Sequence, residues 1–171
     1  MATDQPLISL EEMKARIPAQ LHITKPDYVV FVPDVNPDSI SDTGNEHFLV
    51  FDGPDGSLMA VWTQSSVENY SAELPADQHI AFSISRDEGT TWTPPRIIAG
   101  PKKPGDGRMA SWAFPLVSRS GRLYVLYSQH IGRHDTFFHH TGWLHGITSD
   151  DLGATWSAPQ LVPLPRSIHD N

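Results

Sequence analysis

The sequence predicts an all-β protein made of two four-stranded antiparallel units in tandem. Short apolar runs alternate with turn sequences from residue 47 onward, and one motif occurs twice. The motif reads SRDEGTTW at residues 85–92 and SDDLGATW at residues 149–156, a spacing of 64 residues. Recurrence at a fixed period indicates stacked structural units, so we expect the two halves of this region to share one fold.

The first unit is predicted in chain order from its alternating apolar residues. HFLVFD (47–52), the turn GPDG and SLMAVWTQ (57–64) form a hairpin. HIAFSIS (79–85) follows, with Ile80, Phe82 and Ile84 on one face, and a short strand around residues 96–99 completes the unit.

The second unit repeats this order with WAFPLV (112–117), RLYVLYSQ (122–129), WLHGITS (143–149) and APQLV (158–162). Gly56 matches Gly121, and Trp62 matches Tyr127, each 65 residues later. We expect residues 1–45 to form a lead-in with a capped helix at 9–16, residues 46–105 the first unit, and residues 106–171 the second unit with the start of the next connection.

Composition excludes several classes of function. The chain has 171 residues, no cysteine and a formal net charge of −8, which argues against nucleic acid as a partner and against thiolate chemistry. No apolar run approaches the roughly 18 residues of a membrane span, and the first residues lack the pattern of a signal peptide. We therefore expect no membrane contact and a cytoplasmic location for the chain as written, or secretion if the chain is a fragment.

The repeated motif has the chemistry of a structural turn. In its first copy, the short carboxylate of Asp87 is suited to accept from backbone N–H groups, and Gly89 to adopt a positive φ. Ser85 and Thr91 are placed to connect the strand ends, and Trp92 offers an apolar face for packing between sheets. Tandem four-stranded units fastened in this way indicate a β-propeller, in which radial closure protects the sheet edges.

The pattern S-x-D-x-G-x-T-W resembles the Asp box, and residues 45–163 resemble the sialidase (neuraminidase) superfamily with its bacterial neuraminidase (BNR) repeats. The resemblance implies a sialidase-like β-propeller of six blades, whose Asp boxes lie away from the catalytic face. Four blades of this period would already need about 256 residues, so we interpret the chain as the N-terminal two blades of a six-bladed propeller. The structural Asp-box residues are Ser85, Asp87, Gly89, Thr91, Trp92, Ser149, Asp151, Gly153, Thr155 and Trp156.

Strand connectivity separates the short turns, at one end of each unit, from the long polar segments 64–78 and 128–144, at the other. Function in a propeller belongs to the end with long loops. The mixture of carboxylates, imidazoles and aromatic rings there suits a carbohydrate, whose hydroxyls need polar partners and whose ring needs an apolar platform. The predicted substrate-binding residues are Glu46, His47, Arg108, Trp112, His130 and His134.

The resemblance also implies catalytic roles. The acid/base residue of the superfamily lies between the second and third strands of the first blade, where this chain offers Glu68, Glu73 and Asp77. The nucleophile pair comes from later blades, so none is assigned. An Arg that binds the sialic acid carboxylate is expected at the first strand, but that position is occupied here by Glu46; Arg16 lies in an Arg-Ile-Pro segment at the end of the predicted helix.

The first functional hypothesis is a sialidase-like glycoside hydrolase, an exo-glycosidase for an acidic or neutral sugar, present here as an incomplete chain. The alternatives are a non-catalytic glycan-binding or scaffold propeller, and a uronic-acid lyase that uses the His-rich segment 130–145. A metal site in that segment is disfavoured, because spacing by four residues does not bring two rings together in a loop. We expect no metal and no other cofactor.

Overall fold

The computed structural model describes residues 29–30, 44–65, 78–102, 106–131 and 142–165, and this part of the chain is all-β. The first sheet contains β1 (Gly44–Asp52), β2 (Leu58–Ser65), β3 (His79–Ser85) and β4 (Arg96–Ala99). The second sheet contains β5 (Ala110–Val117), β6 (Leu123–His130), β7 (Gly142–Ser149) and β8 (Gln160–Leu161). Each sheet is antiparallel with its strands in chain order, which confirms the predicted pair of four-stranded units.

The helix predicted at 9–16 lies outside the described residues. In the described ranges, no helix is long and apolar enough to cross a membrane.

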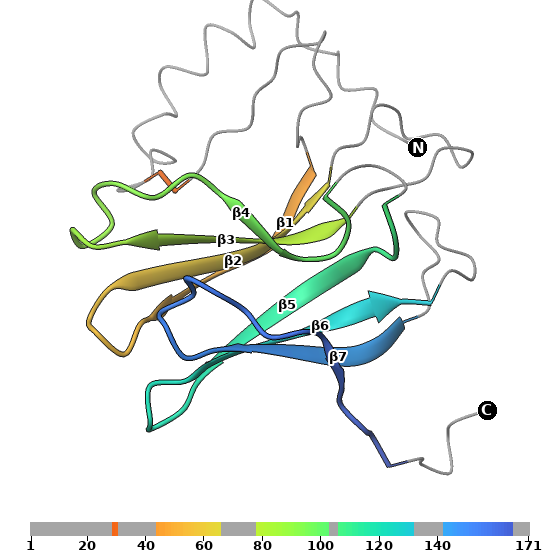
Figure 1. The fold of residues 1–171 in the computed structure, drawn as a ribbon. Coiled ribbons are helices and arrows are strands. Elements are labelled where there is room, and N and C mark those ends of the chain that lie inside the picture. The colour runs from red at the N-terminus through yellow and green to blue at the C-terminus, as the bar shows by residue number, and fades with distance from the viewer. Residues whose placement is uncertain (1–28, 31–43, 66–77, 103–105, 132–141, 166–171) are drawn as a thin grey trace, which may run out of the picture.

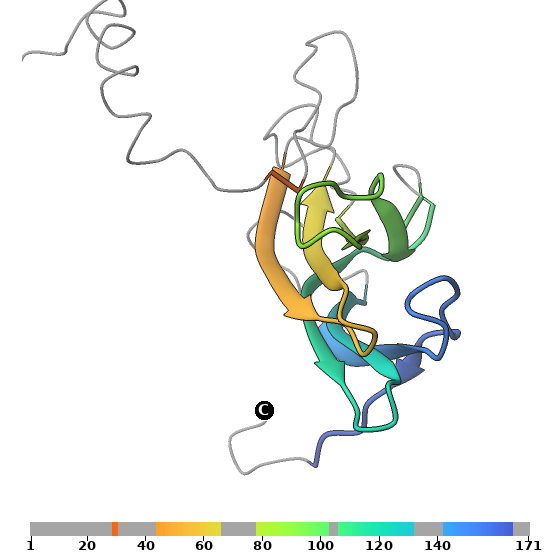
Figure 2. The same cartoon turned by 90° about the vertical axis from the view of Figure 1, so that its left-hand side faces the viewer.

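The two sheets lie one against the other, and β5 runs along the first sheet beside β2 (Figure 1). The four short turns, β1–β2, β3–β4, β5–β6 and β7–β8, all lie at the left of Figure 1 and face the viewer in Figure 2. We call this the turn end, and the opposite edge, where β1, β3, β5 and β7 begin, the strand-start end. The short turns therefore share one end, as predicted, and β3 and β7 begin at the other.

A β-bulge interrupts the first strand of each sheet at the same place. The pairing of β1 with β2 shifts between Glu46 and Leu49, and that of β5 with β6 shifts between Ser111 and Phe114. Within each bulge one residue has a positive φ, 51° at His47 and 57° at Trp112, positions 65 residues apart. Positive φ is uncommon outside glycine, and bulges redirect side chains, so both sheets present one redirected aromatic side chain at the strand-start end.

The hydrophobic core fills the space between the two sheets. The first sheet contributes the predicted Ile80, Phe82 and Ile84 together with Met59 and Val61. The second sheet contributes Leu123, Val125, Tyr127 and Ile147. These side chains alternate along their strands, so one apolar face of each sheet is buried against the other.

The first sheet is buried on its other face as well, where Trp62 and Ala81 pack with Val30 and Trp92. This explains why β3 is buried along its whole length. The second sheet differs. Phe114 and Leu116 of β5 are 57% and 47% exposed, whereas Phe51, which corresponds to Leu116 by the 65-residue repeat, packs against the core between the sheets. The second sheet thus leaves exposed a part of its surface that the first sheet partly buries.

Both Asp boxes form the hydrogen bonds that their residue types predict. In the first box, Asp87 accepts from the Thr91 backbone N–H at 2.8 Å and from the Thr91 hydroxyl at 2.6 Å, while the Ser85 hydroxyl donates to it at 2.8 Å. Gly89 has φ of 88° and donates its N–H to Ser85 Oγ. The second box repeats these contacts through Asp151, Ser149, Gly153 and Thr155.

The second Asp box also holds the sheets together. The ring of Trp156 meets Phe82 of the first sheet edge-on, with centroids 5.5 Å apart. Arg96 of β4 stacks over the same Phe82 and donates hydrogen bonds to the carbonyl oxygens of Gly153 and Ala154. Trp92 instead donates its ring N–H to Gly89 at 3.0 Å, so the two boxes share a turn but differ in what they contact.

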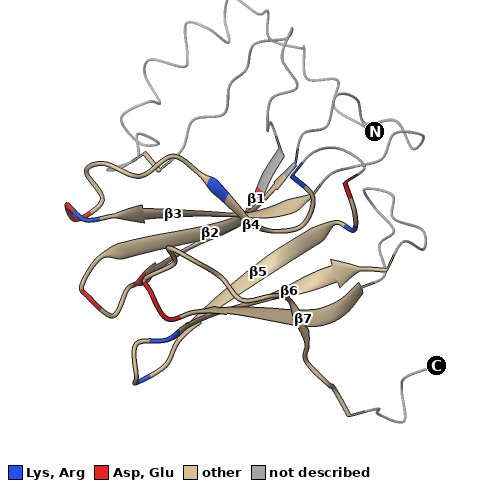
Figure 3. Ribbon diagram, viewed as in Figure 1, with Lys and Arg blue, Asp and Glu red and all other residues tan. Residues whose placement is uncertain are grey.

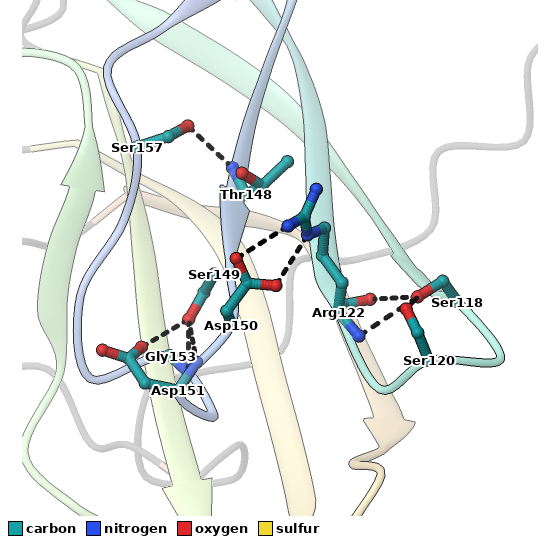
Figure 4. Close-up of polar contacts among 9 residues, drawn as sticks. All are labelled: Ser118, Ser120, Arg122, Thr148, Ser149, Asp150, Asp151, Gly153 and Ser157. Carbon is teal, nitrogen blue, oxygen red and sulfur yellow. Dashed lines mark hydrogen bonds and ion pairs between the residues drawn. The ribbon is translucent and has the colours of Figure 1, made fainter.

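Charged side chains gather in the turns, while β2, β3, β5, β6 and β7 contain no Lys, Arg, Asp or Glu (Figure 3). In each sheet one ion pair joins the hairpin turn to the Asp box. Asp55 pairs with Arg86 at 2.9 Å in the first sheet, and Arg122 pairs with Asp150 at 2.6 Å in the second (Figure 4). Arg86 and Asp150 occupy the same position of the repeat, so the polarity of the pair is reversed.

The Asp boxes predict a loss of stability in acid. The Thr155 hydroxyl and N–H hydrogen bonds lower the pKa of Asp151 from 3.8 to about 2, and those of Thr91 lower the pKa of Asp87. A depressed carboxyl pKa contributes stability that is complete above the unfolded value and is lost as the pH falls through the folded value. The urea midpoint should therefore fall between about pH 4 and pH 2. Asp151→Asn should flatten this decline; an equal flattening by Asp52→Asn, outside the boxes, would contradict the assignment.

Candidate functional site

At the turn end, the Asp-box carboxylates and Asp150 already have hydrogen-bond or ion-pair partners within the protein. Both carboxyl oxygens of Asp87 and of Asp151 accept hydrogen bonds within their own turns. A surface depression beside the second box is lined by Thr148, Asp150 and Ser157, among others. Asp150 there is already paired with Arg122. These carboxylates stabilise turns, as their sequence pattern predicts, and most of their acceptor capacity is used there.

At the opposite end, two pairs of side chains in contact lie where β1, β3 and β5 begin, Glu46 with Gln78 and His47 with Trp112. We call Glu46, His47, Gln78 and Trp112 the strand-start cluster. Glu46 and His47 come from the bulge of β1, Gln78 directly precedes β3, and Trp112 comes from the bulge of β5. The cluster therefore spans both sheets, and three of its members are among the substrate-binding residues predicted from the sequence.

The aromatic part of the cluster is the pair His47 and Trp112. Their rings meet edge-on with centroids 5.8 Å apart, His47 is exposed, and Trp112 is 45% exposed. The backbone N–H of Trp112 donates to the hydroxyl of Thr63 in β2 at 2.8 Å, which anchors the bulge of the second sheet to the first. A half-exposed indole on a fixed backbone suits stacking against the apolar face of a sugar ring.

The polar part of the cluster is the pair Glu46 and Gln78. Glu46 is exposed, whereas Gln78 is only 3% exposed. The Gln78 side-chain N–H donates to Glu46 Oε1 over a long 3.5 Å, and the Gln78 carbonyl accepts from the Ala110 N–H at 2.9 Å. Gln78 Oε1 is buried and has no hydrogen-bond partner in the described part of the chain.

Two buried histidines make contacts next to the cluster, since His79 follows Gln78 in the chain and His130 contacts Ser111, which precedes Trp112. His79 lies 3.2 Å from Gln64 Oε1, and the Nε2 atom of His130 lies 3.0 Å from Ser111 Oγ. His130 and Ser111 are fully buried, so their contact is a structural hydrogen bond and does not present a serine nucleophile to a substrate. The structure places the predicted ligand residue His130 beneath the surface, where it fixes the start of β5.

Arg108 is exposed just before β5, and its carbonyl accepts from the Gln129 side chain at 3.1 Å. Gln129 also donates to Met109 and lies 3.5 Å from the hydroxyl of Tyr127. Burial raises the pKa of Tyr127 to about 12, so this phenol stays protonated over the physiological range. Arg108 is thus held by its backbone while its guanidinium is left to solvent.

Several sequence predictions lie outside the described residues: the acid/base candidates Glu68, Glu73 and Asp77, and the substrate-binding His134. Their roles stay predictions. Within the ranges that the structure describes, no three His, Asp or Glu side chains come together in a way that would hold a metal ion.

Comparison with known proteins bears on this arrangement. The family model described as BNR repeat-like domain matches residues 56–169, most of the two-sheet region. The chain belongs to the BNR repeat-like family. No curated protein matches the chain.

Among solved structures, the BNR repeat-like chain is similar to "Hadza microbial sialidase Hz136", with a TM-score of 0.56 and 22% sequence identity. The similarity covers 70% of this chain and 26% of that one, so the chain spans about a quarter of the length of that sialidase. A protein of unknown function from Dyadobacter fermentans DSM 18053 matches at a TM-score of 0.43 and 19% identity, over 66% of this chain and 26% of that one. The fold is sialidase-like, as the Asp boxes predict.

The sequence did not indicate the roles of Gln78 and Thr63. Gln78 follows a polar segment and looks like a solvated loop residue, and Thr63 lies in an otherwise apolar strand. The one available signal was the 65-residue repeat, which aligns His47 with Trp112 and so places two aromatic side chains at equivalent strand starts.

Proposed function

We propose that the strand-start cluster is part of the carbohydrate site of a sialidase-like glycoside hydrolase. The observation that supports this proposal is the His47–Trp112 pair, an exposed aromatic surface at the same bulge of β1 as the exposed residue Glu46. An apolar platform next to hydrogen-bonding groups matches the two surfaces of a sugar. The location of the cluster, at the end opposite the Asp boxes, agrees with the expectation for this family.

Asp77 is the favoured acid/base candidate in this proposal, with Glu73 and Glu68 behind it. Asp77 directly precedes Gln78, whose side chain contacts Glu46, so the chain leads from the candidate acid into the cluster. A carboxylic acid near a bound sugar is suited to protonate the leaving glycosidic oxygen.

The test is hydrolysis, by the full-length parent protein that the sequence predicts, of a panel of aryl glycosides that includes a sialoside, uronides and neutral sugars. We expect turnover of at least one member, with a loss of at least about a hundredfold in kcat for Asp77→Asn or Glu73→Gln. Glu88→Gln in the first Asp-box turn makes the same change of charge at the far end and should leave the rate unchanged. A substrate whose turnover is unaffected by both site variants would remove these carboxylates from the proposal.

A non-catalytic glycan-binding protein is the second candidate. Glu46 is the single carboxylate of the strand-start cluster as the structure describes it. A glycosidase needs a pair of carboxylates, and the described members of the cluster supply one. Glycan binding without turnover of any panel member would favour this candidate. The lyase alternative depends on the His-rich segment 130–145, of which residues 132–141 lie outside the described residues and His130 is buried.

A further inference from the structure

We propose that Glu46 and Gln78 make the site selective for a sugar that presents hydrogen-bond donors, so that it binds a neutral or amino sugar and disfavours one with a carboxylate at this position. The inference rests on the proposed function, because it names the class of sugar for the same site. It depends on the hydrogen-bond acceptors that the two side chains carry.

The first acceptor is the carboxylate of Glu46, which is exposed at the bulge of β1. A carboxylate accepts hydrogen bonds and does not donate them. Its partner must therefore be a hydroxyl, an amide N–H or an ammonium group.

The second acceptor follows from the orientation of the Gln78 amide. Its nitrogen faces Glu46 Oε1 at 3.5 Å, and because a carboxylate oxygen cannot donate, the amide has to present N–H on that side. Oε1 of Gln78 is then left on the other side, buried and without a hydrogen-bond partner in the described residues. A buried acceptor without a partner is costly, and a donor that reaches it from a ligand would relieve that cost.

Both acceptors are fixed relative to the aromatic platform. The Gln78 carbonyl accepts from Ala110, two residues before Trp112, and the Trp112 N–H is bound by Thr63, which pairs with Glu46 across β1 and β2. A sugar ring that stacks on Trp112 would therefore direct its hydroxyls toward Glu46. A ring carboxylate in the same place would face a like charge, which disfavours binding.

Two described cations lie toward this end, Lys102 and Arg108, and both are exposed. They supply the competing explanation, in which a guanidinium or ammonium group attracts an acidic sugar. Substitution separates the two explanations, since one depends on Glu46 and the other on Arg108.

The experiment measures binding of the full chain to methyl glycosides by saturation-transfer NMR and calorimetry. The glycosides have gluco, galacto and manno configuration, each as the neutral sugar, the 2-amino sugar and the C6 uronate. We expect at least one neutral or amino sugar to bind about tenfold more tightly than its uronate. Glu46→Gln should reduce this ratio by raising affinity for the uronate, and Gln78→Met, which removes the amide at similar size, should weaken the neutral sugar.

Glu88→Gln is the matched control, because it removes the same charge at the turn end and should leave the ratio unchanged. Three outcomes overturn the inference while leaving the proposed function intact: a uronate that binds as tightly as its neutral partner, a ratio that Glu88→Gln shifts as much as Glu46→Gln, or uronate binding lost in Arg108→Gln. If no glycoside binds, the proposed function fails, and this inference fails with it.

Discussion

Replacing Phe82 by alanine is expected to lower the free energy of unfolding by about 3–5 kcal/mol. Phe82 is fully buried between the sheets, meets Trp156 of the second Asp box at 5.5 Å and lies under the guanidinium of Arg96 at 5.8 Å. The substitution would leave a cavity at the point where the first sheet receives the second, because the surrounding strands relax only partly. Urea denaturation, followed by tryptophan fluorescence, measures the change.

Phe114→Ala is the matched control, since it deletes the same side chain at a position that is 57% exposed. It should cost less than about 1 kcal/mol. Equal losses of stability in the two variants would contradict the conclusion that Phe82 is packed between the sheets.

Replacing Gly153 by alanine is expected to cost about 2–5 kcal/mol, from two sources. Gly153 has φ of 79°, where a side chain costs about 1–2 kcal/mol. A Cβ there would also lie 2.6 Å from Cζ of Phe82, a ring that the core holds in place, and such overpacking costs about 1–3 kcal/mol. The free energy of unfolding from urea titration tests the total.

Gly56→Ala separates the two sources. Gly56 has φ of 82°, but a Cβ there meets no atom within 4 Å. Only the backbone contribution, about 1–2 kcal/mol, should be lost. If Gly153→Ala and Gly56→Ala lost the same free energy of unfolding, the close packing of the second Asp box on Phe82 would be contradicted.

The sequence predicted the parts of the fold that depend on local chemistry. Strand positions follow from alternation, as in Ile80, Phe82 and Ile84, and the Asp-box turn follows from the reach of one short carboxylate to its own backbone. The positive φ of Gly89 was expected, but that of its neighbour Glu88 was not, because glutamate gives no sign of it.

The remaining features depend on contacts between residues far apart in the chain. The bulges that redirect His47 and Trp112 arise from pairing with β2 and β6, and no residue type marks them. His130 was expected at a ligand because it lies in the long polar segment 128–144, whereas its burial beside Ser111 is set by packing. Gln78 could not be predicted as a site residue, because its role depends on a contact with Glu46, 32 residues earlier.

The reversed ion pairs at the turn end bear on how two similar units fold without exchanging partners. Within each sheet the hairpin turn and the Asp box carry opposite charges, Asp55 with Arg86 and Arg122 with Asp150. If the hairpin of one unit associated with the Asp-box strand pair of the other, Asp55 would face Asp150 and Arg122 would face Arg86. Exposed pairs of this kind add little to the stability of the native state, yet like charges would penalise both hybrids. Each native unit thus joins opposite charges across its two turns, whereas each hybrid would bring like charges together.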